Sequence, residues 1–201
     1  MSAVRDLMKG WMDQLDQGRS ADDIVACIDA RFQAATGEDR YELARVLQTF
    51  LVIARREEEV LQLLDKMMKE FPDDIELPMH KAEAYLYGLR DFPRALKWID
   101  VAIERADRQG RSQREARGYK ARILLKLGRG DELSDVLEEI MALRLNKSAL
   151  DVGRERDFVD RAPPGLIRKD VLDRYNEFRP KRATDEAGDM PPKFEPPEEA
   201  L

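Results

Sequence analysis

A recurring set of apolar residues is the feature that most constrains how this chain can fold. Three such sets at helical spacing occupy the middle of the sequence, and the members of each set follow one another after 35 and then 38 residues. The equivalent residues are Val60, Ala95 and Leu133; Leu64, Ile99 and Leu137; and Met67, Ala102 and Ile140. Residues three and four apart lie on one side of an α-helix. The chain is therefore predicted to be all-α, with repeated two-helix units.

The central unit, residues 79–106, shows how each pair of helices is expected to pack. Ala82 and Leu86 mark the inward face of a first helix, and Ala95 begins the inward face of a second. A short polar hinge over residues 90–93 separates the two patterns. Small residues on facing helices let two backbones approach closely, so we expect an antiparallel helical hairpin.

This unit resembles the tetratricopeptide repeat, a helix–turn–helix unit of 34 residues. The residues that carry the resemblance are Leu47, Leu51, Val60, Leu64, Met67 and Pro72; Ala82, Leu86, Ala95, Ile99 and Ala102; and Ala121, Leu124, Gly128, Leu133, Leu137 and Ile140. The resemblance covers about half of the chain. It implies a right-handed α-solenoid of antiparallel helical hairpins, whose first helices face a groove that holds a peptide or a partner helix.

The chain divides into four expected segments. These are an N-terminal helical hairpin over residues 1–38, three tetratricopeptide-like repeats over 39–145, a degenerate repeat or capping helix over 146–180, and a disordered tail over 181–201. Ile167, Val171 and Tyr175 lie at one-sided helical spacing and favour a C-terminal capping helix over 166–178. The tail is acidic and rich in proline, a composition that does not bury enough apolar area to order itself.

Composition and charge favour a soluble cytoplasmic protein. The net charge of −6 argues against general nucleic-acid binding. Cys27 is the single cysteine, which excludes an intramolecular disulfide and fits a reducing compartment. The first residues carry charges throughout and do not resemble a signal peptide, and no apolar run has the length of a membrane span. We therefore expect no membrane association.

The sequence holds few residues from which a catalytic site is usually built. His80 is the single histidine, and none of the eleven glycines belongs to a phosphate-binding or nucleophile motif. We therefore expect no enzyme, no metal and no cofactor. A carboxylate-dependent enzyme stays open as an alternative because acidic residues are abundant, although most of these acids lie on helices where a solvated face is typical.

A cluster of basic residues between positions 105 and 129 is the most unusual local feature. It contains Arg105, Arg108, Arg111, Arg114, Arg117, Lys120, Arg122, Lys126 and Arg129, against Asp107 and Glu115. One interpretation is a docking surface for an acidic partner, since arginine binds carboxylates through two parallel hydrogen bonds. An equally weighted interpretation is a solvated helix face balanced by acids of the next helix. Nucleic-acid binding is a weaker hypothesis because Tyr119 is the only aromatic residue in the cluster.

The resemblance implies which residues face the groove. They are Arg45, Thr49 and Val52 in the first unit, His80, Ala84 and Tyr87 in the second, and Gly118, Arg122 and Lys126 in the third. Arg114 and Arg117 of the basic cluster join them as candidate partner-binding residues. For His80, a partly exposed histidine without a binding role is the competing interpretation.

The expected function is a non-catalytic adaptor or scaffold that binds a protein or peptide partner with acidic character. Apolar groove contacts would supply affinity, and arginine would supply selectivity. The alternatives are a nucleic-acid-binding protein and a self-associating structural subunit, because the exposed end faces of repeats can stack.

Overall fold

The computed structural model describes residues 3–111, 114–144 and 158–178, and within these ranges the chain is helical and contains no strand. The α-helices are α1 (Ala3–Asp16), α2 (Ala21–Ala34), α3 (Gly37–Ile53), α4 (Glu57–Glu70), α5 (Glu76–Glu83), α6 (Phe92–Arg108), α7 (Arg114–Leu127), α8 (Gly130–Arg144) and α10 (Lys169–Phe178). A π-helical turn, η1 (Ala84–Gly88), continues α5. The tail over 181–201 lies outside the described residues, as do residues 146–157 and 179–180 of the expected degenerate repeat or capping helix.

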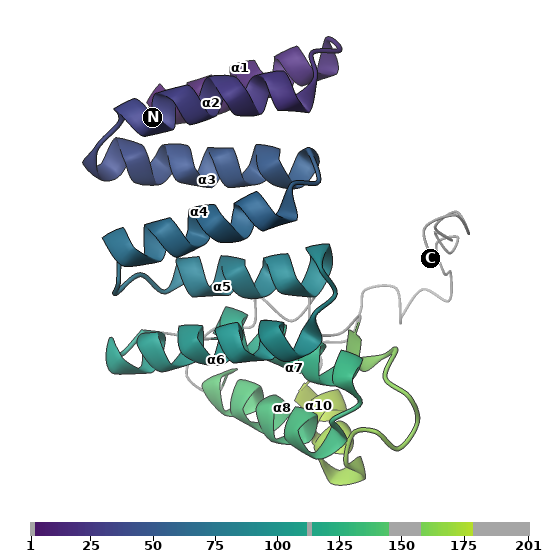
Figure 1. Ribbon diagram of the computed structural model, residues 1–201. Helices are drawn as coiled ribbons and strands as arrows, with labels where there is room; N and C mark the ends of the chain where they lie inside the picture. Colours follow the sequence, from purple (N-terminus) through teal and green to yellow (C-terminus); the bar gives the residue numbers. More distant parts are fainter. Residues whose placement is uncertain (1–2, 112–113, 145–157, 179–201) are drawn as a thin grey trace.

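The helices stack in chain order, each against its neighbour in the sequence (Figure 1). The even-numbered helices α2, α4, α6 and α8 begin at residues 21, 57, 92 and 130, so their starts are 36, 35 and 38 residues apart. This spacing matches that of the apolar sets. The nine residues of those sets are at most 1% exposed, which confirms the predicted inward face of each second helix.

The buried residues form two apolar clusters. The first cluster runs from Val4 to Leu77 and belongs to α1–α5. The second cluster runs from Ala82 to Tyr175 and belongs to α5–α10. The two clusters meet at α5, whose residues Leu77 and Ala82 belong to different clusters.

Each turn from an odd-numbered to an even-numbered helix contains a residue in the left-handed conformation. These residues are Gly18, Arg55, Arg90 and Gly128, with φ of 91°, 56°, 53° and 67°. A side chain makes this conformation about 1–2 kcal/mol less favourable. Two turns therefore use glycine, whereas the two central turns place an arginine in the same strained conformation.

The first helix of the central unit, α5, is not the continuous α-helix that was expected. From Ala84 onward the backbone widens into η1, and the Leu89 N–H donates to the Ala84 carbonyl at 3.1 Å. Gly88 permits this path, because a Cβ at that position would lie 2.9 Å from Cγ of Glu57. The hinge predicted over residues 90–93 is shorter in the structure, because α6 already begins at Phe92. The Asp91 side chain caps this helix by accepting a hydrogen bond from the Arg94 N–H at 3.0 Å.

Helix α10 packs on α8, as Figure 1 shows at the end of the stack. Its Val171 and Tyr175 are fully buried, which agrees with the predicted one-sided pattern. Ser134 of α8 joins the two elements, because its hydroxyl donates to the Gly130 carbonyl at 2.8 Å and accepts from the Arg168 N–H at 3.0 Å. None of the helices in the described ranges combines the length and apolar character that crossing a bilayer requires.

A pair of glycine variants tests the contact between α8 and the segment before α10. Gly130→Ala is expected to lower the free energy of unfolding by about 2 kcal/mol, because the added Cβ would overlap the Leu166 carbonyl oxygen. The matched Gly10→Ala variant adds a Cβ that meets nothing within 4 Å inside α1. That variant is expected to stabilise the chain by about 0.5–1 kcal/mol. Urea unfolding measures both, and equal midpoints would contradict the packing described.

Candidate binding surfaces

Three of the predicted groove residues lie along one face of α3. Arg45, Thr49 and Val52 are four and three residues apart, which places them on one side of the helix. Arg45 Nη2 lies 3.9 Å from a carboxylate oxygen of Glu76 at the start of α5. The Thr49 hydroxyl donates to the Arg45 carbonyl at 3.1 Å, and Val52 is 53% exposed.

The structure brings Tyr87 and Arg122 together. The Tyr87 ring is 54% exposed on η1, and its hydroxyl accepts a hydrogen bond from the Arg122 guanidinium of α7. Arg122 also lies over the Phe158 ring, 5.9 Å from the ring centroid. Lys126, one turn further along α7, is exposed and forms no ion pair within the described ranges. His80 is half-buried, and its Nδ1 atom has no hydrogen-bond partner among the described residues.

Contacts between successive odd-numbered helices place these residues on a common surface. Glu76 connects α5 to α3, and Tyr87 connects η1 to α7. A hydrogen bond between Glu83 and Tyr119 provides a second connection from α5 to α7. We call this area the odd-helix surface and define it by Arg45, Thr49, Val52, His80, Tyr87, Arg122 and Lys126.

Arg114 and Arg117 do not add exposed charge to the odd-helix surface. The Nε atom of Arg117 lies 2.6 Å from a carboxylate oxygen of Glu139 on α8, and its side chain is only 14% exposed. Arg114 is also half-buried and engaged in a polar interaction. Both arginines are therefore occupied within the fold.

Other members of the basic cluster also have partners within the fold. Lys120 Nζ lies 2.8 Å from Asp100 of α6, and Arg129 Nε lies 2.5 Å from Glu132. Arg105 donates to the Asp74 carbonyl at 2.8 Å. The acids that balance the cluster thus come from both sides of α7. Glu138, another acid of α8, instead contacts Arg168 and Arg174.

Exposed apolar side chains gather at the ends of α3 and η1. Val52 and Ile53 end α3, while Tyr87 and Leu89 lie at the end of η1, and all four are at least 40% exposed. Sequence reasoning missed Ile53 and Leu89, because it considered only the residues at groove-facing spacing. Their place in the sequence could have identified them, because each comes one or two residues before an arginine in the left-handed conformation, in the turn after its helix.

Tyr119 is unsuited to base stacking because its ring is half-buried. Burial and the hydrogen bond to Glu83 raise the pKa of its hydroxyl well above the ordinary value of 10.0. In the described part of the chain, no group of three His, Cys, Asp or Glu residues has an arrangement that could hold a metal ion.

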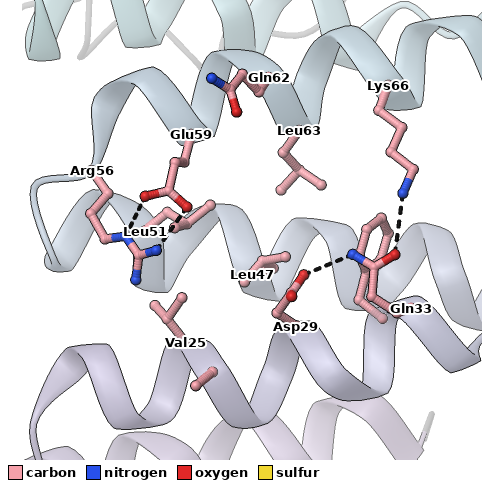
Figure 2. Close-up of a pocket in the computed structure, with 12 residues that line it drawn as sticks. Val25, Asp29, Gln33, Leu47, Leu51, Arg56, Glu59, Gln62, Leu63 and Lys66 are labelled. Carbon is pink, nitrogen blue, oxygen red and sulfur yellow. Dashed lines mark hydrogen bonds and ion pairs between the residues drawn. The ribbon is translucent and has the colours of Figure 1, made fainter.

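A groove between α2 and α4 lies away from the odd-helix surface. Its volume is about 390 Å³, and residues of α3 form its floor (Figure 2). Val25, Phe32, Leu47, Leu51 and Leu63 supply apolar side chains, and Ala26, Asp29, Gln33, Arg56, Glu59, Gln62 and Lys66 complete the lining. Leu47 and Leu51 each lie two residues after Arg45 and Thr49, and because two residues turn an α-helix by about 200°, they lie on the opposite side of α3. No pattern in the sequence predicted this groove.

The raised pKa of Tyr119 predicts a loss of stability at alkaline pH. The unfolded chain releases this proton near pH 10, whereas the folded chain retains it to higher pH. The resulting stabilisation is complete below pH 10 and is lost as the pH rises above it. Between pH 9 and 11.5, the free energy of unfolding should fall more steeply for the wild-type chain than for Tyr119→Phe. Parallel curves would contradict the contact with Glu83.

The chain was also compared with known proteins. No protein-family model, no curated protein and no solved structure matches it significantly. The fold and the two surfaces therefore rest on the sequence and geometry of this chain alone.

Proposed function

We propose that this chain is a non-catalytic scaffold that binds a protein segment on its odd-helix surface. In this proposal the stacked hairpins form a right-handed, tetratricopeptide-like α-solenoid, and the odd-numbered helices line its binding face. The regular spacing of the even-numbered helices and the burial of their nine equivalent residues support this architecture.

The observation that carries the proposal is the exposed Tyr87 ring held in place by Arg122. Burying a side chain of this size contributes about 1.5–3 kcal/mol, and a fixed ring loses little conformational entropy on binding. Val52 is a second exposed apolar group on the same surface. The π-helical turn that presents Tyr87 is a kind of irregularity often found at functional sites.

Charge on the odd-helix surface favours a partner segment with acidic residues. Arg45 is balanced by Glu76. Within the ranges that the structure describes, Lys126 forms no ion pair, and Arg122 contacts a neutral hydroxyl and an aromatic ring but no carboxylate. A carboxylate beside Tyr87 would therefore find two cations at the α7 side. We propose an acidic segment with at least one apolar side chain as the ligand.

A charge-reversal pair tests this proposal. Peptides selected from a random displayed library on the wild-type chain should be enriched in acidic and apolar residues. Binding of these peptides to Arg122→Glu/Lys126→Glu is expected to weaken at least about tenfold, since two attractive charges become repulsive. Fluorescence anisotropy with labelled peptides measures the affinities.

The control variant Lys69→Glu/Lys97→Glu makes the same change in net charge at exposed lysines of α4 and α6. It is expected to keep wild-type affinity. Equal weakening by both variants would mean that only net charge matters. Unchanged affinity in the α7 variant would place the binding site elsewhere.

A further inference from the structure

Helices α2, α4, α6 and α8 each carry an acid directly after a central buried residue. The pairs are Ile28–Asp29 in α2, Leu64–Asp65 in α4, Ile99–Asp100 in α6 and Leu137–Glu138 in α8. The four acids follow one another after 36, 35 and 38 residues, the same intervals that separate the starts of these helices. They therefore occupy equivalent positions in four successive hairpins.

Three of these acids bind a cation supplied by the next element along the chain. Asp65 pairs with Lys81 of α5, and Asp100 pairs with Lys120 of α7 at 2.8 Å. Glu138 pairs with Arg168, just before α10, at 3.2 Å. A cation paired with this acid is thus a recurring part of the junction between one hairpin and the next.

Asp29 is the exception among the four. Its contact is a hydrogen bond from the Gln33 side-chain amide at 3.0 Å, and no Lys or Arg of the described residues forms an ion pair with it. In α3, the residue equivalent to Lys81 and Lys120 is Val46, the position just before a buried residue of the inward face. The first junction therefore has the acid but lacks the cation.

The space that the cation fills elsewhere is open at the first junction. In the next junction, Lys81 is buried, and its ammonium lies 4.0 Å from the centre of the Trp98 ring. The residue of α4 that lies 35 positions before Trp98 is the smaller Leu63. The groove of about 390 Å³ between α2 and α4 lies here, with Asp29 and Leu63 both in its lining (Figure 2).

The two cations already present in the groove are engaged by other groups. Arg56 binds Glu59 at 2.6 Å and Asp22 at 3.2 Å, at one end of the groove. At the other end, the Lys66 ammonium lies 3.3 Å from the Gln33 carbonyl oxygen and 5.0 Å from the centre of the Phe32 ring. Figure 2 shows Asp29 between these ends, with Gln33 separating it from Lys66.

We propose that the groove between α2 and α4 binds a lysine or arginine side chain presented by a partner protein. Asp29 is the counter-ion, and Leu47, Leu51 and Leu63 contact the aliphatic part of the bound side chain. The partner's cation thereby supplies, at the first junction, the ion pair that Lys81 and Lys120 supply at the next two junctions. The groove lies on the opposite side of α3 from the odd-helix surface, so it is a second site and does not depend on the proposed function.

A titration with n-hexylammonium, followed by NMR on the full-length isotope-labelled chain, tests this proposal. The probe carries the charge and the aliphatic stem of a lysine side chain, and hexanol is its uncharged counterpart. We expect saturable shift changes confined to the groove, centred on Asp29, Leu47 and Leu63. In Asp29→Asn the dissociation constant should rise on the order of fivefold. Hexanol lacks the charge, so its affinity for the wild-type chain should be no higher than the affinity of n-hexylammonium for Asp29→Asn.

Two further variants control the result. Asp65→Asn removes the equivalent acid that already has a cation, and it is expected to leave binding in the α2–α4 groove unchanged. Val46→Lys supplies an internal cation, and it is expected to weaken binding of n-hexylammonium as Asp29→Asn does.

Three results would overturn the proposal. The first is a response spread over the whole surface, and the second is equal affinity of the wild-type chain and Asp29→Asn. The third is a change of the same groove signals when the probe-free chain is diluted, because that would make a second copy of the chain the occupant.

Discussion

The burial of one apolar stripe on each even-numbered helix is the interaction on which the rest of this structure depends. Leu64 and Ile99 are almost completely removed from water, and each such side chain contributes about 1.5–3 kcal/mol to folding. A buried stripe also determines how its helix is rotated about its own axis. The acid that follows each central stripe residue is thereby directed to the edge of the interface, where a cation from the next element reaches three of the four acids.

Much of the helical architecture was predictable because it follows from local periodicity. The inward faces of the second helices and the one-sided pattern of α10 were predicted from spacing alone, and burial in the structure confirms these faces. The expected partner-binding role of the odd-helix surface, in contrast, stays a prediction. Spacing identifies which side of a helix is free, but it does not identify what that side binds.

The features that the sequence did not reveal depend on the register between helices. Arg117 was expected to present charge to a partner, yet its neighbour Glu139 becomes visible only when α7 and α8 are packed. The π-helical turn at Ala84–Gly88 ends where Gly88 lies against Glu57 at the start of the preceding helix α4. The missing cation beside Asp29 likewise emerges only when four junctions are compared in space. Side-chain periodicity within one helix contains none of this information.

The division of the apolar core into two clusters has a mechanical consequence for both surfaces. The boundary between the two apolar clusters falls at α5, so the helices on either side of it do not share one continuous core. A ligand lying across Val52, Tyr87 and Lys126 would contact helices of both clusters and would restrict their motion relative to each other. A ligand in the groove between α2 and α4 touches only the first cluster, so it leaves the bending of one half of the molecule against the other unrestrained.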